Sequence, residues 1–294
     1  MNALKEAGPE GVPIPRRIAF INEKGGSGKT TLVSNVAVYL AWRRGRRVLA
    51  IDMDPQGQLG KVLGLEVRRP RRSAIELLVD SVLGEGPRPE SLDAPPEPGL
   101  PIVATRFPNL DAIVSNKSLA LFPSWTGAGA EESDPTGRLA RSLTETPGAL
   151  DYDFVLIDAP PSFGPLTLNI LRAANELVVP VPLTYLAMDG CAELMRSVDM
   201  VRQRYGNEDL RLTMVIPTFY RRTRLANEIL EKLKQRFPKE IAHTVVGFHV
   251  RIDEAQSRGQ SVFEHAPSDR GAKVMAALAE ELEARGRPEF GAAP

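Results

Sequence analysis

The sequence lacks disulfide-forming cysteine pairs and long hydrophobic runs. It has one cysteine, Cys191, among 294 residues, which excludes an intramolecular disulfide and an all-cysteine zinc or iron–sulfur site within one chain. No run approaches the roughly eighteen apolar residues that span a bilayer, and residues 1–15 have no apolar core of signal-peptide length. These absences favour a cytoplasmic protein.

The chain also lacks a net charge, because its 37 Lys and Arg residues balance its 37 Asp and Glu residues. This balance excludes a polybasic, histone-like protein, but it permits nucleic-acid binding, which depends on local clusters of cations. Apolar residues make up 43% of the chain and charged residues 25%, within the range of globular proteins and outside that of disordered chains. We therefore expect a folded protein.

Short apolar runs alternate with helical patterns along the chain. Several runs show no polar alternation, as is typical of strands buried on both faces. The expected strands are residues 16–21, 48–51, 110–114, 154–157, 177–181, 212–216 and 244–250. The expected helices are residues 30–44, 166–174, 189–205, 224–236 and 271–285. This order predicts an α/β fold with a doubly wound, mainly parallel sheet and helices on both faces.

Two stretches interrupt this order. Residues 84–101 are rich in proline and glycine, and residues 124–137 are mostly small or polar, so both are expected to be surface insertions. Residues 1–15 and 287–294 contain too little apolar surface to offset the entropy of ordering, and we expect flexible tails. A single domain over residues 16–286 is therefore predicted.

A glycine-rich segment, Lys-Gly-Gly-Ser-Gly-Lys-Thr-Thr, joins the first expected strand to the first expected helix. In this context backbone N–H groups converge on phosphate oxygens, Lys29 supplies a charge to the β and γ phosphates, and the Thr30 hydroxyl can bind Mg²⁺. A tight strand-to-helix turn would explain the glycines but not Lys29 and Thr30. The expected nucleotide-binding residues are Gly25, Gly26, Ser27, Gly28, Lys29, Thr30 and Thr31.

The loop departs from the ordinary phosphate-loop pattern at one position. Glu23 stands where that pattern has its first glycine, and a second lysine, Lys24, lies five residues before Lys29. In this form the segment resembles the deviant Walker A motif of the ParA/MinD family of partition and positioning ATPases. The resemblance continues, in order over residues 16–286, through segments similar to switch I at 52–57 and to Walker B and switch II at 158–162. Further matches lie at residues 189–190, 250–255 and 268–272.

Three aspartates follow the second strand and a later buried strand. Asp158 ends a buried strand, where ligands bind in open α/β sheets, and is expected to hold Mg²⁺ through water. Asp54 is placed to orient the attacking water, and Asp52 lies near the metal shell or, alternatively, forms a turn. The resemblance implies the same roles, with loss of Asp54 leaving ATP bound but uncleaved. The expected cofactors are ATP and Mg²⁺.

Lys24 precedes the loop and cannot easily curl back onto the γ-phosphate of its own subunit. The resemblance implies that it crosses a two-fold interface to the phosphates of a second subunit, so that ATP becomes part of a homodimer contact. Lys24, Lys29 and Asp54 then form the catalytic set. A solvated lysine at a loop edge is the alternative. The resemblance also places the base-binding loop at Pro217 and Thr218.

Cations gather toward the C-terminal part of the chain, where residues 216–275 contain eleven Lys and Arg and seven Asp and Glu. The resemblance implies non-specific DNA binding through Arg222 and Arg251. Arg221, Arg224 and Lys234 are expected as further phosphate contacts, although a solvated helix face is the alternative. With no interleaved aromatics and no groove-reading motif expected here, contacts to the DNA backbone without sequence selection are predicted.

The resemblance implies a ParA-like ATPase that forms an ATP-dependent dimer on the nucleoid and positions or segregates a cargo. The cargo would be a chromosome or plasmid, the division site or another large assembly, and a ParB-like adaptor would stimulate hydrolysis. A membrane anchor is not expected, because residues 278–286 form an acidic rather than a basic helix. A metabolic ATP-dependent synthetase or kinase without DNA binding is the alternative, and a dimerisation module with scarcely any turnover is a third possibility.

Overall fold

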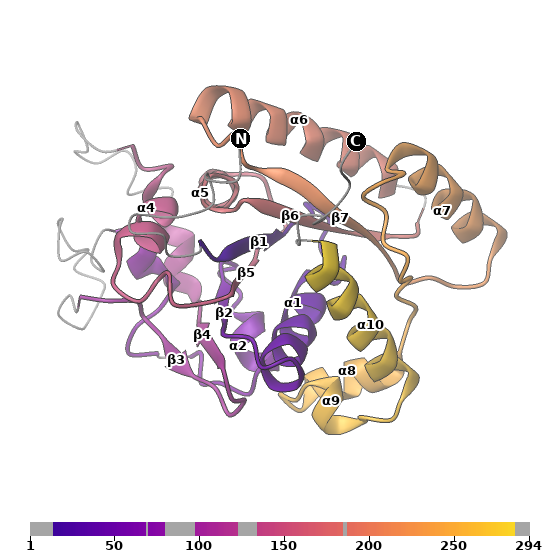
Figure 1. The fold of residues 1–294 in the computed structure, drawn as a ribbon, viewed down its shortest axis with the longest axis horizontal. Coiled ribbons are helices and arrows are strands. Elements are labelled where there is room, and N and C mark those ends of the chain that lie inside the picture. The colour runs from indigo at the N-terminus through magenta and orange to yellow at the C-terminus, as the bar shows by residue number, and fades with distance from the viewer. Residues whose placement is uncertain (1–13, 69, 80–97, 123–133, 185–186, 286–294) are drawn as a thin grey trace, which may run out of the picture.

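The computed structural model describes residues 14–68, 70–79, 98–122, 134–184 and 187–285 (Figure 1). The predicted tails 1–15 and 287–294 and the predicted insertions 84–101 and 124–137 lie wholly or mostly outside these ranges. The domain boundaries therefore stay a prediction.

A seven-stranded sheet in the order β3-β4-β2-β5-β1-β6-β7 forms the centre of the molecule (Figure 1). All pairings are parallel except that of β3 with β4 at one edge. The strands are β1 (Arg16–Phe20), β2 (Val48–Asp52), β3 (Val103–Ala104), β4 (Leu110–Ile113), β5 (Phe154–Asp158), β6 (Glu176–Pro182) and β7 (Arg211–Thr218). The predicted mainly parallel sheet is confirmed.

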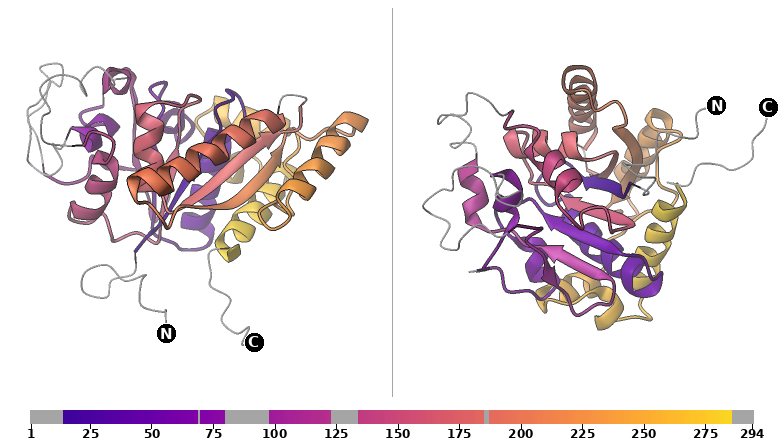
Figure 2. Two further views of the ribbon diagram at one scale, coloured as in Figure 1. Left: turned by 90° about the horizontal axis from the view of Figure 1, so that it is seen from above. Right: turned by 60° about the vertical axis from the view of Figure 1, so that its left-hand side comes forward.

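Helices cover both faces of the sheet (Figures 1 and 2). One face carries α4 (Arg138–Glu145), α5 (Pro165–Ala173), α6 (Ala187–Tyr205) and α7 (Arg224–Arg236), with the short 3₁₀ turns η3 (Ala74–Leu78) and η5 (Lys117–Leu121). The other carries α1 (Lys29–Val38), α2 (Gln58–Val62), α8 (Val250–Ser257), α9 (Val262–His265) and α10 (Arg270–Arg285). The predicted helix 30–44 is α1 followed by a π-helical turn, η2 (Tyr39–Arg43).

The alternation of side chains along each strand divides the core into two layers. Leu49 and Ile51 of β2 pack toward α4 to α7, whereas Val48 and Ala50 pack toward α1 and α10. Because both faces of a strand are buried, both sets of positions must be apolar. This is why the central strands read as continuous hydrophobic runs in the sequence.

The predicted strand at residues 244–250 is wrong. The segment follows β7 through isolated bridges only, and its last residue already begins α8. The N–H groups of His243 and Thr244 donate to the carboxylate of Glu281 on α10, at 2.8 and 3.0 Å. A side chain from a helix thus takes the donors that a continuous ladder would use, so the sheet ends at β7.

The order of the strands creates a crevice at their carboxyl ends. The chain passes from β1 to β2 on one side of the sheet and from β5 across β1 to β6 on the other. In open α/β sheets, ligands bind where the strand order reverses in this way. The loop between β1 and α1 and the ends of β2 and β5 meet at this edge.

Candidate functional site

The glycine-rich loop between β1 and α1 is shaped to receive an anion. Gly26 and Gly28 have φ angles of 70° and 95°, in the region that favours glycine. Gly28 is the N-cap of α1 and provides no side chain to accept from the first-turn N–H groups. These donors, together with the positive end of the helix dipole, suit a phosphate.

Lys29 is held inside the loop that it serves. Its ammonium donates to the carbonyl oxygen of Asn22 at 2.9 Å, and only 6% of the residue is exposed. Burial lowers the pKa of Lys29, while the charges of Asp158 and Asp54 act in the opposite direction. The Lys29 ammonium is thus held beside the N–H groups of the loop, so a bound phosphate could contact the ammonium and these N–H groups together.

Thr30 and Asp158 are brought together as predicted. The Thr30 hydroxyl donates to Oδ2 of Asp158 at 2.6 Å, and Asp158 is fully buried at the end of β5. Oδ1 of Asp158 has no hydrogen-bond partner among the residues that the structure describes. Burial raises the pKa of Asp158 to about 7, against the opposing effects of the Thr30 hydrogen bond and the Lys29 charge.

Asp52 and Asp54 lie on the neighbouring strand end and form a turn. Asp52 is fully buried and its carboxylate accepts from the N–H groups of Asp54 and Leu59, both at 3.0 Å. Its pKa is raised well above the usual value by burial and then by Asp158, its partner in the β2–β5 register. Asp54 accepts from the Gln56 N–H at 2.9 Å. Asp52 therefore forms the turn that was one of its two expected roles, and this turn lies beside the predicted metal site.

The donor set fits a magnesium ion that arrives with a nucleotide. Among the described residues, no group of three His, Cys, Asp or Glu side chains could hold a metal alone. Mg²⁺ prefers oxygen ligands, keeps several waters and is usually bound by one or two protein oxygens plus phosphates. The Thr30 hydroxyl and the unpartnered oxygen of Asp158 provide that limited set.

Lys24 lies at the exposed rim of the site. Its backbone N–H donates to Oδ1 of Asn22 at 2.8 Å, and its ammonium donates to the Thr184 hydroxyl at 2.9 Å. The side chain is therefore directed to the end of β6 rather than into the loop of its own subunit. A donor at the rim can meet an acceptor on a second molecule.

The end of β7 forms the other wall of the loop. The Thr218 hydroxyl donates to the Ser27 carbonyl at 3.1 Å, and a small cavity of about 60 Å³ is lined in part by Gly28, Thr31, Thr218 and Phe219. Pro217 precedes this wall within β7 and does not line the cavity. Of the two predicted base-loop residues, the structure thus brings Thr218 against the phosphate loop.

Sequence reasoning missed two residues that shape this site. Asn22 binds the N–H of Lys24 through its side chain and the ammonium of Lys29 through its carbonyl. Its position shortly after the first strand is the only sequence feature that could have indicated this role. Phe219 has a φ of 55°, an uncommon conformation for a large residue, and its ring lies 3.7 Å from where a Cβ at Gly28 would stand. No sequence pattern predicts a positive φ angle at Phe219.

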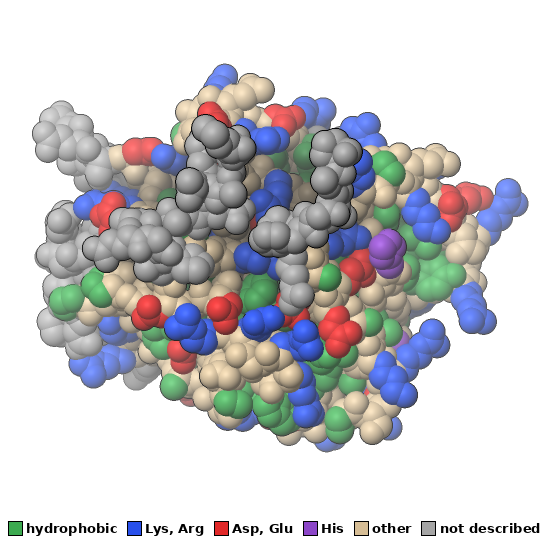
Figure 3. Space-filling model, viewed as in Figure 1, with side chains coloured by type: hydrophobic (Ala, Val, Ile, Leu, Met, Phe, Trp, Pro, Cys, Tyr) green, Lys and Arg blue, Asp and Glu red, His purple; other side chains and the backbone are tan. Residues whose placement is uncertain are grey.

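The five predicted DNA-contacting cations all lie on exposed positions, four at or along α7 and one on α8. Three pair with glutamates on their own helix: Arg224 with Glu228, Lys234 with Glu231 and Arg251 with Glu254. The other two, Arg221 and Arg222, make no ion pair with a residue that the structure describes. Figure 3 accordingly shows Lys and Arg side chains interspersed with acidic ones on the α7 side of the molecule.

One exposed aromatic side chain lies beside these cations, contrary to the expectation from sequence. The guanidinium of Arg221 lies 5.8 Å from the ring centre of Phe248, and Phe248 is 50% exposed. The two residues are 27 positions apart, and the parallel bridge between Tyr220 and Gly247 brings their segments together. The fold therefore places an exposed aromatic ring from a distant segment beside Arg221.

A phosphate loop between β1 and α1, with a threonine hydroxyl bonded to a buried aspartate at the end of the neighbouring strand β5, defines a P-loop nucleotide-binding site. Residues 15–212 match a protein family described as an AAA domain. The chain is 39% identical over 271 residues to the chromosome-partitioning ATPase Soj of Thermus thermophilus, covering 92% of this chain and 96% of that protein. The chain therefore belongs to the ParA/MinD family of positioning ATPases, and it is an ATPase that uses ATP and Mg²⁺.

The chain is also similar to a second curated protein and to a solved structure. The sporulation initiation inhibitor protein Soj of Bacillus subtilis is 36% identical over 275 residues, covering 92% of this chain and 98% of that protein. A solved structure of cobyrinic acid a,c-diamide synthase from Mycobacterium smegmatis, with bound ADP and magnesium, superimposes with a TM-score of 0.69 at 28% identity. It covers 91% of this chain and 93% of that one. No helix in the described part of the chain is long and apolar enough to cross a membrane.

Proposed function

We propose that this ATPase dimerises around ATP, binds DNA non-specifically as a dimer, and positions a large cargo until hydrolysis releases it. The observation that carries this proposal is the pair of lysines in one loop. Lys29 is buried beside the phosphate-binding N–H groups, whereas Lys24 is directed to the exposed rim. This difference supports a role for Lys29 at its own subunit's nucleotide and for Lys24 at that of a second subunit.

The catalytic roles follow from the contacts of each residue. Lys29 and the N–H groups of the loop would bind the β and γ phosphates, and Thr30 with Asp158 would hold Mg²⁺. Bound there, Mg²⁺ would stabilise the charge on the transferred phosphoryl group. Asp54, at the turn after β2, orients the attacking water, and Asp52 fixes that turn through two backbone hydrogen bonds.

Lys24 links nucleotide occupancy to dimerisation in this proposal. Its ammonium is bonded to a neutral hydroxyl, Thr184, which a phosphate of a second subunit can outcompete because a charge-assisted hydrogen bond is stronger. Two nucleotides then sit in the contact between the subunits. Loss of the γ-phosphate removes one acceptor from each lysine and weakens the dimer.

The DNA face is assigned to Arg222 and Arg251, with Arg221, Arg224 and Lys234 as further contacts. Arg222 forms no ion pair with a described residue, so its charge is fully available to a phosphate. To bind DNA, Arg251 must break its ion pair with Glu254 and pair with a phosphate instead. This exchange is feasible because ion pairs at an exposed helix surface are weak. Binding to the DNA backbone of this kind weakens steeply with salt.

The biological setting follows from the relatives. Several are chromosome-partitioning proteins, and PomZ of Myxococcus xanthus, 34% identical, is a cell division protein. We therefore propose a protein of the cytoplasm that associates with the nucleoid, moves a replicon, division site or other large assembly, and responds to a ParB-like adaptor. No membrane attachment is part of this proposal.

An ATP-dependent synthetase or kinase without DNA binding is the second candidate. It is favoured by one observation, the likeness to a solved structure described as a cobyrinic acid a,c-diamide synthase. The relatives of higher identity are partitioning ATPases, so this candidate ranks second. A small acceptor molecule that accelerates ATP turnover more than DNA does would support it.

The test is binding to unrelated DNA duplexes at low salt. Asp54→Ala protein should bind them with Mg–ATP and not with Mg–ADP. Arg222→Glu and Arg251→Glu should each weaken binding, whereas Arg202→Glu, a change at an exposed arginine on α6, should not. Equal binding in both nucleotides, or full affinity in both DNA-face variants, would overturn the proposal.

A further inference from the structure

A hydrogen bond joins the phosphate loop to helix α8 across a large sequence separation. Nε2 of Gln256, on α8, donates to the Thr31 hydroxyl, on the first turn of α1, at 2.7 Å. Gln256 is half-buried, and no part of the proposed catalytic cycle uses it. It is the only side chain outside the loop, among the described residues, that binds the hydroxyl of Thr31.

Thr31 lies at the N-terminal end of α1, where a phosphate bound by the loop would contact the helix. It is the third residue of α1, after Lys29 and Thr30, and it lines the small cavity beside Gly28. A threonine hydroxyl has one proton to donate and two lone pairs that accept. Gln256 occupies one lone pair, so the proton remains available for an acceptor in the site.

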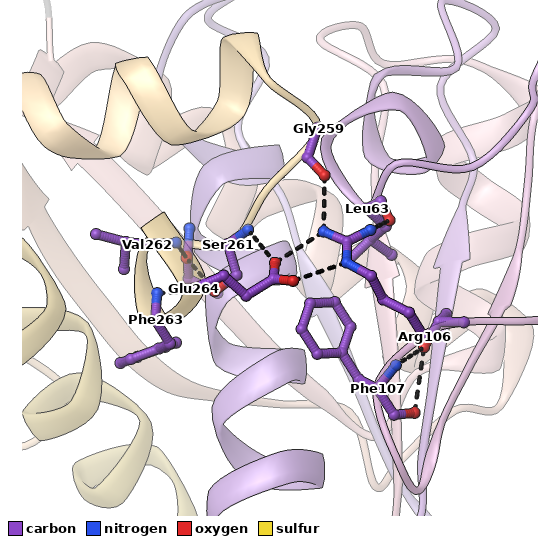
Figure 4. Close-up of polar contacts among 10 residues, drawn as sticks. Leu63, Arg106, Phe107, Gly259, Ser261, Val262, Phe263 and Glu264 are labelled. Carbon is purple, nitrogen blue, oxygen red and sulfur yellow. Dashed lines mark hydrogen bonds and ion pairs between the residues drawn. The ribbon is translucent and has the colours of Figure 1, made fainter. Parts of the chain in front are cut away.

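The segment that carries Gln256 is fixed from two sides. Oδ1 of Asn35, on α1, accepts from the Ser261 hydroxyl at 3.2 Å and from the Val262 N–H at 3.0 Å. Arg106, in the loop between β3 and β4, donates to the Gly259 carbonyl and to Glu264, each at 2.7 Å (Figure 4). These contacts hold α8 and α9 against α1.

The same guanidinium reaches the helix that follows switch I. Arg106 also donates to the carbonyl of Leu63, at the C-terminal end of α2 (Figure 4). Arg106 thus links three segments of the chain, namely its own loop, the end of α2 and the α8–α9 segment. The position of the segment that carries Gln256 is therefore fixed by other contacts and does not depend on the hydrogen bond between Gln256 and Thr31.

We propose that Gln256 is a positioning residue of the nucleotide site. By donating to Oγ1, it orients the Thr31 hydroxyl so that its proton is directed to a phosphate oxygen of the bound nucleotide. Hydrogen bonds in such a chain strengthen one another, so nucleotide binding also tightens the bond between Thr31 and Gln256. Helix α8 thereby becomes part of the nucleotide site.

This arrangement has a consequence for Arg251, which rests on the proposed function. Arg251 lies on α8, five positions before Gln256. A helix rises about 1.5 Å per residue, so roughly 7.5 Å of rigid helix separates the two. Occupancy of the phosphate loop would thereby stabilise the helix that presents an arginine to DNA.

The experiment uses Mg–ADP as the probe, since ADP carries no γ-phosphate and avoids both turnover and the proposed ATP dimer. Gln256→Leu should bind Mg–ADP about five-fold more weakly than wild type, the equivalent of one net hydrogen bond. Gln256→Glu should bind more weakly still, because a carboxylate withdraws the Thr31 proton and adds negative charge near the phosphates. Gln235→Leu, at an exposed position on α7, is the matched control and should bind as wild type does.

Hydrogen exchange of the α8 amides separates positioning from simple structural support. In wild type, Mg–ADP should slow exchange across residues 250–257, and in Gln256→Leu this ligand-induced slowing should disappear while exchange without ligand stays similar. Gln256→Glu, which conserves side-chain size, provides the same test if Gln256→Leu fails to fold.

The proposal would be overturned by unchanged Mg–ADP affinity in both Gln256 variants, or by α8 protection that persists in them. Because these measurements need no DNA and no dimer, they are independent of the proposed function. A wild-type protein that does not bind DNA would remove the consequence for Arg251 and leave the assignment of Gln256 intact.

Discussion

The buried carboxylate of Asp158 should make the stability of the nucleotide-free protein depend on pH. Its pKa is raised by burial from the ordinary 3.8 to about 7. Between these values the native state holds a proton that the unfolded state has released, so stability falls as pH rises through this window and levels off above about pH 7. One proton gives a slope of about −1.4 kcal/mol per pH unit at most, so the loss of stability over the window is on the order of a few kcal/mol.

The perturbation that tests this reasoning is Asp158→Asn, which replaces the carboxyl by a neutral group of the same shape. Urea unfolding without Mg²⁺ at several pH values between about 5 and 8 should show a smaller slope in the variant, by about one proton, and greater stability near pH 8. Asp52 remains in both proteins, and its raised pKa adds a dependence of the same sign, which the loss of the Asp158 charge reduces in the variant. Parallel stability curves for wild type and variant would refute the argument.

Two further predictions concern the loop and the switch I turn. Lys29→Ala should abolish measurable nucleotide binding in calorimetry, because it removes the buried cation of the loop, and residual affinity near wild type would contradict its role. Gly57→Ala should destabilise the protein by roughly 2 kcal/mol or more, since φ is 62° and the new Cβ would lie 2.6 Å from the Ser115 carbonyl oxygen. Gly206→Ala has a similar φ of 69° and open space, so thermal unfolding should show a smaller loss; equal losses would mean that the contact with Ser115 is unimportant.

The nucleotide site could be predicted from sequence because its parts are local. The loop residues lie at fixed spacing between a strand and a helix, and Asp158 ends a run that is apolar on both faces. Spacing of this kind determines geometry without knowledge of the rest of the fold. The pairing of Thr30 with Asp158 then follows from the adjacency of β1 and β5.

The features that escaped prediction depend on contacts between distant segments. The apolar run at 244–250 is an excellent strand candidate, yet Glu281 on α10 takes the N–H groups of His243 and Thr244. Phe248 reaches Arg221 only because its segment bridges to the end of β7. Local pattern carries no information on such partners, which is why the edge of the sheet and the aromatic ring beside Arg221 were missed.

The central claim is that Lys24 joins two subunits through ATP. Sedimentation velocity of Asp54→Ala with saturating Mg–ATP should show dimers, and the double variant with Lys24→Ala should sediment as a monomer while still binding nucleotide. Monomers in Asp54→Ala alone, or undiminished dimers without the Lys24 ammonium, would contradict the account.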